Sequence, residues 1–107
     1  MRRGDLITVA LRGDLGKPRP ALVVQSDLFD QHPSVAVLPV TSERVEAALF
    51  RISLRPDNAN GLQRLSQVMV DKPQSVRCHR LGPVFGRVDD ETMLAVNRAL
   101  AVFLGLA

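Results

Sequence analysis

Residues that build disulfides, metal centres and membrane spans are scarce in this sequence. Its single cysteine, Cys78, excludes an intramolecular disulfide, and neither it nor His32 nor His79 has the spacing of a metal-ligand set. The longest apolar run, residues 99–104, is far shorter than the roughly 20 residues that cross a bilayer. The first residues also lack the apolar core of a signal peptide. We therefore expect a cytoplasmic protein that does not enter a membrane and whose functional site uses neither a metal nor a cofactor.

Aromatic residues and lysines are also rare. There is no tryptophan or tyrosine and there are only four phenylalanines, which argues against a broad surface for stacking nucleic-acid bases. The formal net charge of +3 arises from twelve arginines and two lysines against eleven acidic residues. Because guanidinium groups match phosphate geometry, this excess is compatible with nucleic-acid binding through arginines, amides and backbone. It is equally expected from a GC-rich genome.

The chain has the length of one compact domain, and we expect a single unit over residues 1–107. Apolar or alternating runs predict strands, the last of them an edge strand, at residues 6–10, 21–25, 35–40, 48–54, 62–70 and 72–77. The second and third of these runs are rich in β-branched residues, as in strands buried on both faces. Loops or turns are predicted at residues 13–20, 26–33 and 57–61. The loop at residues 26–33 is expected to contain one turn of helix.

The C-terminal part has helical periodicity. The β-rich part is expected to close before Gly82, and beyond it apolar residues recur on one helical face at Met93, Val96, Leu100, Phe103 and Leu104. Asp89 or Asp90 is expected to cap this helix at its N-terminus, and Gly105 to end it. Together the elements predict a β-rich α+β fold, in which an antiparallel, strongly twisted sheet or small open barrel carries helices on its outside.

An arginine and a pair of hydroxyl groups lie at the ends of two neighbouring predicted strands. Arg19 precedes Pro20, whose ring restricts the backbone around it, so this guanidinium is held more firmly than a mobile surface arginine. Thr41 and Ser42 follow the apolar run 35–40 and add neutral hydrogen-bond donors. Either motif alone is common at loops and strand ends that have no function. Together they predict a metal-free grip on a phosphodiester, with RNA as the substrate.

Five stretches of the sequence have an order and spacing that are more specific than any one of them: Arg3-Gly4-Asp5-Leu6-Ile7, Arg19-Pro20-Ala21-Leu22-Val23-Val24, Leu38-Pro39-Val40-Thr41-Ser42, Arg64–Asp71, and the terminal helix with Leu104-Gly105-Leu106. Through them the chain resembles the MazF/PemK/Kid family of toxin ribonucleases from bacterial toxin-antitoxin systems, along almost its whole length. The resemblance implies an SH3-like, strongly twisted antiparallel β-barrel with a C-terminal α-helix, working as a homodimer.

The resemblance also implies roles for individual residues. Arg19 takes the place of the family's catalytic arginine and Thr41 that of its catalytic threonine, while substrate binding is implied for Ser42, Arg64 and Gln67. The alternative is that Arg64 is a solvated strand arginine and Gln67 an amide at the edge of the core. The implied reaction is metal-free cleavage of single-stranded RNA, in which the 2'-hydroxyl attacks the adjacent phosphate and leaves a 2',3'-cyclic phosphate and a 5'-hydroxyl. No general base is assigned, because arginine stays charged and is a poor proton acceptor. The implied partner is an antitoxin whose flexible, acidic tail covers the basic RNA groove.

Two other functions stay open. Residues 24–27 resemble a segment of CcdB, a gyrase poison that shares this fold without RNase activity, but CcdB acts through a Trp-Gly-Ile end and this chain has no tryptophan. Two residues depart from the family pattern: Ser66 stands where several relatives carry an aspartate, and Met69 stands where many carry an arginine. A degenerate member that only binds RNA, or that represses its own operon, is therefore the other alternative. Substitution of Arg19 is expected to abolish activity if the protein is a ribonuclease, and to matter little under the other two functions.

Overall fold

The computed structural model describes residues 1–10, 17–46 and 49–107. Within them the chain forms one α-helix and seven strands, in the order β1 (Asp5–Ala10), β2 (Pro18–Val23), β3 (Ser34–Thr41), β4 (Arg51–Leu54), β5 (Ser66–Met69), β6 (Gln74–Arg77), β7 (Leu81–Arg87) and α1 (Asp90–Phe103). Two 3-10 turns, η1 (Asp27–Phe29) and η2 (Cys78–Arg80), interrupt the series. The first of them is the turn of helix expected between the second and third strands.

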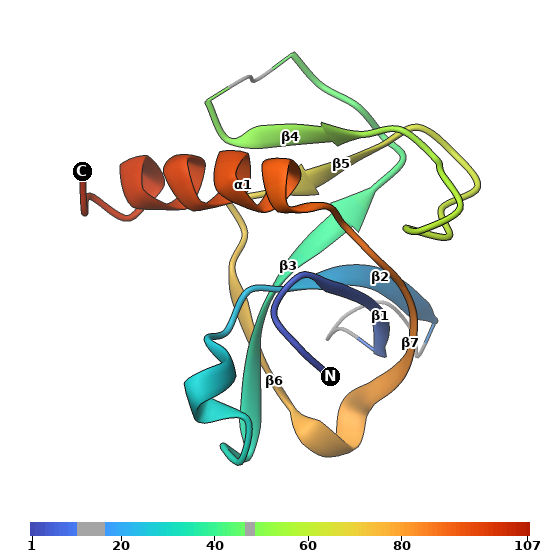
Figure 1. Ribbon diagram of the computed structural model, residues 1–107, viewed down its shortest axis with the longest axis vertical. Coiled ribbons are helices and arrows are strands. Elements are labelled where there is room, and N and C mark those ends of the chain that lie inside the picture. Colours follow the sequence, from blue (N-terminus) through green and yellow to red (C-terminus); the bar gives the residue numbers. More distant parts are fainter. Residues whose placement is uncertain (11–16, 47–48) are drawn as a thin grey trace.

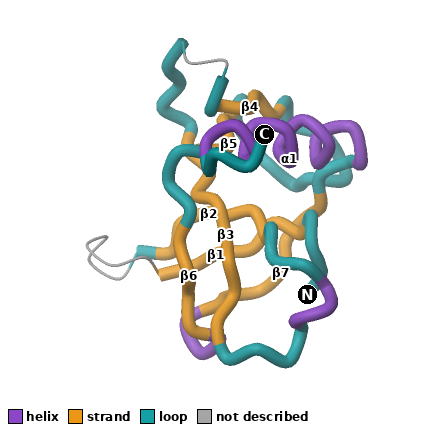
Figure 2. Tube along the Cα trace, turned by 90° about the vertical axis from the view of Figure 1, so that its left-hand side faces the viewer, coloured by secondary structure: helices purple, strands orange, loops and turns teal. Residues whose placement is uncertain are grey.

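All strand pairs are antiparallel, which confirms the predicted fold class. The strands follow the order β4-β5-β3-β2-β1-β7, and β6 also pairs with β3. Strand β3 is the longest at eight residues, and it pairs with β6 through its first half, with β2 through its middle and with β5 at its end. The sheet therefore curls around β3, and α1 lies at the end of the molecule that carries β4 and β5 (Figures 1 and 2).

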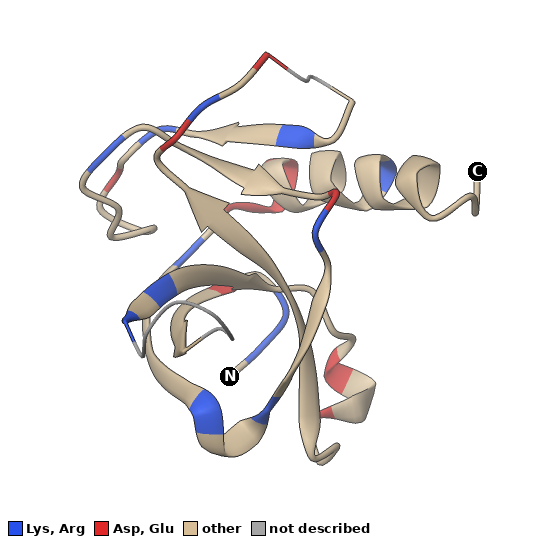
Figure 3. Cartoon of the chain, turned by 180° about the vertical axis from the view of Figure 1, so that it is seen from behind, with Lys and Arg blue, Asp and Glu red and all other residues tan. Residues whose placement is uncertain are grey.

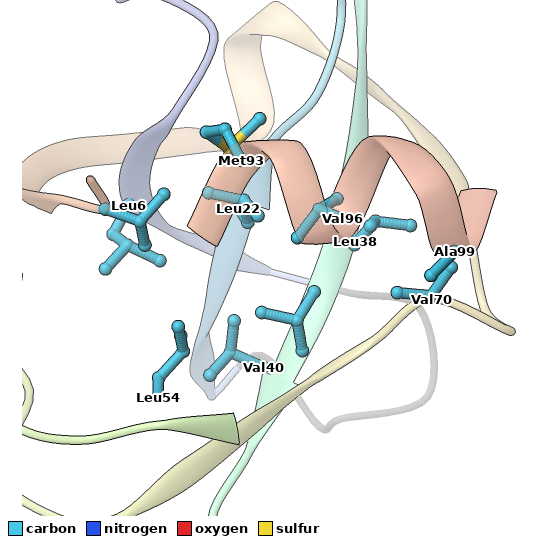
Figure 4. Packing of buried hydrophobic residues seen from close by; sticks show 11 residues of the cluster. Leu6, Leu22, Leu38, Val40, Leu54, Val70, Met93, Val96 and Ala99 are labelled. Atoms are coloured by element: carbon cyan, nitrogen blue, oxygen red, sulfur yellow. The ribbon is translucent and has the colours of Figure 1, made fainter. Parts of the chain in front are cut away.

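Alternate residues of the central strands fill two apolar clusters on opposite faces of the sheet. In β2, Leu22 belongs to the cluster beneath α1, whereas its neighbours Ala21 and Val23 belong to the cluster inside the curl. Figure 4 shows the first cluster, in which Met93, Val96 and Ala99 of α1 face the sheet. Because both faces are covered, β2 and β3 are buried on both sides, as their β-branched sequences predict.

The boundaries of β2 and the existence of β7 correct the sequence predictions. Strand β2 begins at Pro18, so Arg19 lies within the ladder and not in the preceding loop, of which residues 13–16 fall outside the described residues. Strand β7, Leu81–Arg87, lies where the β-rich part was expected to have closed already. It pairs with β1 across two register shifts, and a Cβ at Gly82 would lie 2.0 Å from Thr8 Oγ1. Glycine therefore permits close approach of the strands here, and does not end them.

The helix begins and ends where the sequence predicts. Asp89 is the N-cap and accepts a 2.7 Å hydrogen bond from the backbone N–H of Thr92, and the hydrogen bonds with Thr92 lower the pKa of the Asp89 carboxyl. Gly105 has a φ of 76° and follows the last turn. The predicted apolar face is only partly buried, because Phe103 and Leu104 are 46% and 53% exposed. No helix in the described part of the chain has the length and apolar character of a membrane span.

Candidate active site

A groove of about 490 Å³ lies between the start of β2, the end of β3 and the segment that leads into β5. It is lined by Arg19, Pro20, Pro39, Val40, Thr41, Ser42, Glu43, Leu62, Gln63, Arg64, Ser66 and Met69. Four of the five predicted site residues are among them. The fold thus brings Arg19, Thr41 and Arg64 together from three separate segments of the chain.

The antiparallel pairing of β2 and β3 sets the position of Arg19 relative to Thr41. The ladder ends at the pair of Ala21 with Pro39, two residues after Arg19 and two residues before Thr41, so both residues lie at the same end of the β2–β3 pair. Arg19 itself pairs with Val9 of β1, so the backbone that carries the guanidinium is held by the β1–β2 ladder. Arg19 itself is exposed. This is the geometry of a cation presented to a ligand by a rigid backbone.

The hydroxyl of Thr41 accepts a 3.0 Å hydrogen bond from the backbone N–H of Glu43. This bond fixes the side chain of Thr41 and turns the chain away from the end of β3. A hydroxyl has one proton and two acceptor sites, so the bond from Glu43 leaves the proton of Thr41 able to donate to an anion. Ser42, the next residue, is exposed on the same wall of the groove.

The opposite wall of the groove comes from the segment that precedes β5. Arg64 is exposed there, and its carbonyl accepts a 2.8 Å hydrogen bond from the hydroxyl of Ser66. Gln67 does not line the groove: it is 7% exposed, and its side-chain amide bonds the backbone of Val45. The two positions that depart from the family pattern, Ser66 and Met69, both line the groove.

A turn at residues 57–61, with Asn60 as its one buried residue, anchors this wall to the rest of the fold. Asn60 is 4% exposed, and its side-chain oxygen accepts hydrogen bonds of 3.0 Å from the backbone N–H groups of Asp57 and Leu62. The turn packs against β7, where the N–H of Arg87 donates a 2.8 Å hydrogen bond to the carbonyl of Ala59. Leu62, at the end of the turn, lines the groove and packs against the core. The turn was predicted from its sequence, but its connection to the site was not.

Sequence reasoning missed Glu43 and Gln63, which line the groove next to residues it had identified. The groove lining contains two arginines and one carboxylate. Basic residues near the start of β2 and in the β4–β5 connection lie on one side of the molecule (Figure 3). His32 and His79 are exposed and do not line the groove. The described ranges contain no group of three or more histidine, cysteine or acidic side chains arranged to hold a metal ion. The groove is thus suited to binding an anion through arginines and hydroxyls.

Comparison with known proteins identifies the family. The family model described as PemK-like, MazF-like toxin of type II toxin-antitoxin system matches residues 2–104. Probable endoribonuclease MazF of Mycolicibacterium smegmatis is 46% identical and aligns over 100% of this chain and 99% of its own length. Endoribonuclease EndoA of Bacillus subtilis is 24% identical over 99% of this chain and 96% of its own length.

The solved structures agree with this result. A mycobacterial endoribonuclease in complex with its cognate antitoxin superposes with a TM-score of 0.85 at 25% identity, covering 100% of this chain and 97% of that one. The Mycobacterium tuberculosis toxin MazF-mt6, at 24% identity, has the same fold with a TM-score of 0.82 over 96% of this chain and 98% of its own. The chain therefore belongs to the PemK-like, MazF-like toxins of type II toxin-antitoxin systems.

Proposed function

We propose that this protein is a toxin that cleaves single-stranded RNA at selected sequences without a metal ion, as one toxin domain spanning residues 1–107. The observation that carries the proposal is the convergence of Arg19, Thr41, Ser42 and Arg64 on one groove. The curated relatives that align over the whole chain are named endoribonucleases, which supports the same activity here. Of the two alternatives, RNA binding without cleavage would use the same groove, in which Ser66 and Met69 also lie, and the cleavage assay below separates it from the ribonuclease.

In the proposed reaction the 2'-hydroxyl of one nucleotide attacks the adjacent phosphorus. The new 2'-oxygen–phosphorus bond forms as the bond to the 5'-oxygen of the next nucleotide breaks. The 2'-hydroxyl loses its proton and the departing 5'-oxygen gains one, so the products are a 2',3'-cyclic phosphate and a 5'-hydroxyl. Negative charge increases on the non-bridging phosphate oxygens in the transition state, and a cation placed at these oxygens stabilises it.

In this proposal Arg19 and Thr41 act on that phosphate. Arg19 presents two parallel N–H donors to its oxygens from a backbone that is paired with β1. Thr41 donates its hydroxyl proton to the phosphate or to the attacking hydroxyl, since its oxygen already accepts from the N–H of Glu43. Ser42 and Arg64 contact the neighbouring nucleotides from the two walls of the groove. The general base and acid are not assigned to a side chain.

The proposal includes two protein partners. One is a second copy of this chain, forming a homodimer. The other is a cognate antitoxin, as in the solved complex of the mycobacterial endoribonuclease. A flexible antitoxin tail with acidic and apolar residues would pair with Arg19 and Arg64 and exclude RNA from the groove.

The test is incubation of the purified protein with a long single-stranded RNA in EDTA, followed by mapping of the cut sites and their end groups. Arg19→Ala should lower the cleavage rate by about 100- to 1,000-fold, the effect of removing one preorganised donor from a transition state. Arg98→Ala is the matched control, because Arg98 is exposed on α1 and does not line the groove. Discrete cuts with cyclic phosphate ends that disappear only in the Arg19 variant are expected. Intact RNA from folded wild-type protein would refute the proposal and direct the work to a gyrase assay.

A further inference from the structure

Both polar atoms of the Gln67 side chain are bound to the backbone of one residue. The side-chain oxygen accepts a 3.0 Å hydrogen bond from the N–H of Val45, and the side-chain nitrogen donates a 2.9 Å hydrogen bond to the carbonyl of the same residue. Gln67 is 7% exposed, so these bonds form largely away from water. The amide therefore replaces a strand partner for Val45, which belongs to none of the described strands.

This pairing closes the loop that forms one wall of the groove. Gln67 is also the cross-strand partner of Thr41 in the β3–β5 ladder. Residues 42–44 are thus held between two points, Thr41 and Val45, that are both attached to Gln67. A third bond, from the N–H of Glu43 to the hydroxyl of Thr41, tightens the turn inside this loop. Thr41, Ser42 and Glu43 all line the groove.

We propose that Gln67 is a positioning residue, which holds the loop that carries Ser42 and Glu43 and fixes the hydroxyl of Thr41, and that it does not contact RNA. The inference rests on the proposed function for its catalytic consequence, but the loop pairing itself does not. It replaces the role in substrate binding that the family resemblance implied for Gln67. The oxygen of the Gln67 amide and one of its two N–H protons are engaged with the backbone of Val45. The side chain is 7% exposed and does not line the groove, so it is not presented to RNA.

Only an amide of this length provides the pairing. Glutamate has nearly the same shape but its carboxylate has no proton to donate to the carbonyl of Val45, and it sets two acceptors against each other. Leucine provides neither bond and leaves the N–H and the carbonyl of Val45 without their partner. The two substitutions therefore predict a graded loss, with the pairing weakened in Gln67→Glu and removed in Gln67→Leu. Gln31→Glu is the matched control, because Gln31 is exposed and does not line the groove.

The first experiment needs no RNA. Amide hydrogen exchange of Val45 and Glu43, measured by NMR on the free protein, should be slow in the wild type and in Gln31→Glu. It should be at least about tenfold faster in both Gln67 variants, because each N–H then opens to water locally. Unchanged exchange at Val45 in Gln67→Leu would overturn the pairing. Since RNA is absent, this result is independent of whether the protein is a ribonuclease.

The second experiment separates positioning from contact. Gln67→Leu should lower kcat for RNA cleavage by about 10- to 100-fold, the range expected when catalytic groups shift by up to an ångström. The Kd for a 2'-O-methyl copy of the cleaved oligonucleotide, which cannot react, should stay within about twofold of the wild type. A raised Kd with kcat unchanged would show that Gln67 contacts RNA and would overturn the inference. Failure of the wild type to cut would instead refute the proposed function.

A measurement on the wild-type protein covers the case in which a Gln67 variant does not fold. The two side-chain N–H protons of Gln67 give their own NMR signals. Addition of the 2'-O-methyl oligonucleotide should leave these signals nearly unshifted and slow to exchange, while signals of Ser42 and Arg64 move. Displacement of the Gln67 signals by more than those of Arg64 would overturn the inference.

Discussion

Gly86 of β7 packs against the turn at residues 57–61, which anchors one wall of the groove, and it leaves no room for an added methyl group. A Cβ at this position in β7 would lie 2.0 Å from the carbonyl oxygen of Asn60, whereas ordinary contact begins at 3.4 Å. The obstacle is the backbone of a buried residue, since Asn60 is 4% exposed and its side chain is bonded within the turn. Rotation of a side chain therefore cannot relieve the overlap, and Gly86→Ala must push the turn away from β7.

The cost follows from three contributions. Overpacking of this kind costs about 1–3 kcal/mol. Separation of the turn from β7 also weakens the 2.8 Å hydrogen bond from Arg87 to Ala59, which contributes about 1 kcal/mol. The third contribution is favourable: alanine restricts the unfolded chain more than glycine does, which stabilises the folded protein by about 0.4–1 kcal/mol. We expect Gly86→Ala to lower the free energy of unfolding by about 2 kcal/mol, which corresponds to a Tm lower by roughly 8–16 °C.

Thermal unfolding followed by circular dichroism, at one fixed protein concentration, measures this change. Gly105→Ala is the control: Gly105 has a φ of 76° with no atom within 4 Å of an added Cβ, so only backbone strain of about 1 kcal/mol is expected. Because the turn leads into Leu62 and Arg64, Gly86→Ala should also raise KM for RNA at temperatures where it is folded. A Tm for Gly86→Ala equal to or above that of the wild type would refute the close approach.

Two further predictions concern charged side chains outside the groove. Asp71→Ala should lower the free energy of unfolding, measured in urea, by about 2 kcal/mol, because the 11% exposed Arg51, 3.1 Å away, loses its partner. Asp71→Asn should lower it by less. Equal stability of Asp71→Ala and the wild type would contradict the prediction. Asp89→Ala should lower Tm at pH 7. The pKa of Asp89 in the folded protein lies below its ordinary value of 3.8. The stability that the Asp89 carboxylate contributes is therefore present above that pH and is lost as the pH falls through the folded pKa. The Tm difference should therefore shrink below about pH 4, and a constant difference down to pH 2 would count against the cap.

The strands around the site were predictable because their local patterns and their environment agree. Runs such as Val35–Val40 are β-branched and apolar, and the structure buries them on both faces. Strand β7 was not predictable, because Gly82 and Gly86 weaken a strand by local propensity and are explained only by contacts with Thr8 and Asn60. Those contacts join residues far apart in the sequence.

The candidate site shows the same division. Arg19 and Thr41 were identified because each lies at the end of a recognisable strand, and the pairing of β2 with β3 then brings these two ends together. Arg64 was identified through the family resemblance, and the structure places it in the same groove. Gln67 came from that resemblance too, but its burial and its bonds to Val45 depend on the folded loop. Glu43 and Gln63 carry no sequence signal other than their neighbours.

The triple pairing of β3 has a consequence for the newly synthesised chain. Arg19 and Thr41 come to the same end of the sheet as soon as β2 and β3 pair, but the wall that carries Arg64 is fixed only when β5 joins the end of β3. Such pairing between distant segments is slow compared with local structure. A ribosome-bound chain that has not yet released residues 66–69 therefore has half a groove. The proposed toxic activity would begin only after most of the protein has been made, at a stage when an antitoxin can already recognise the finished surface.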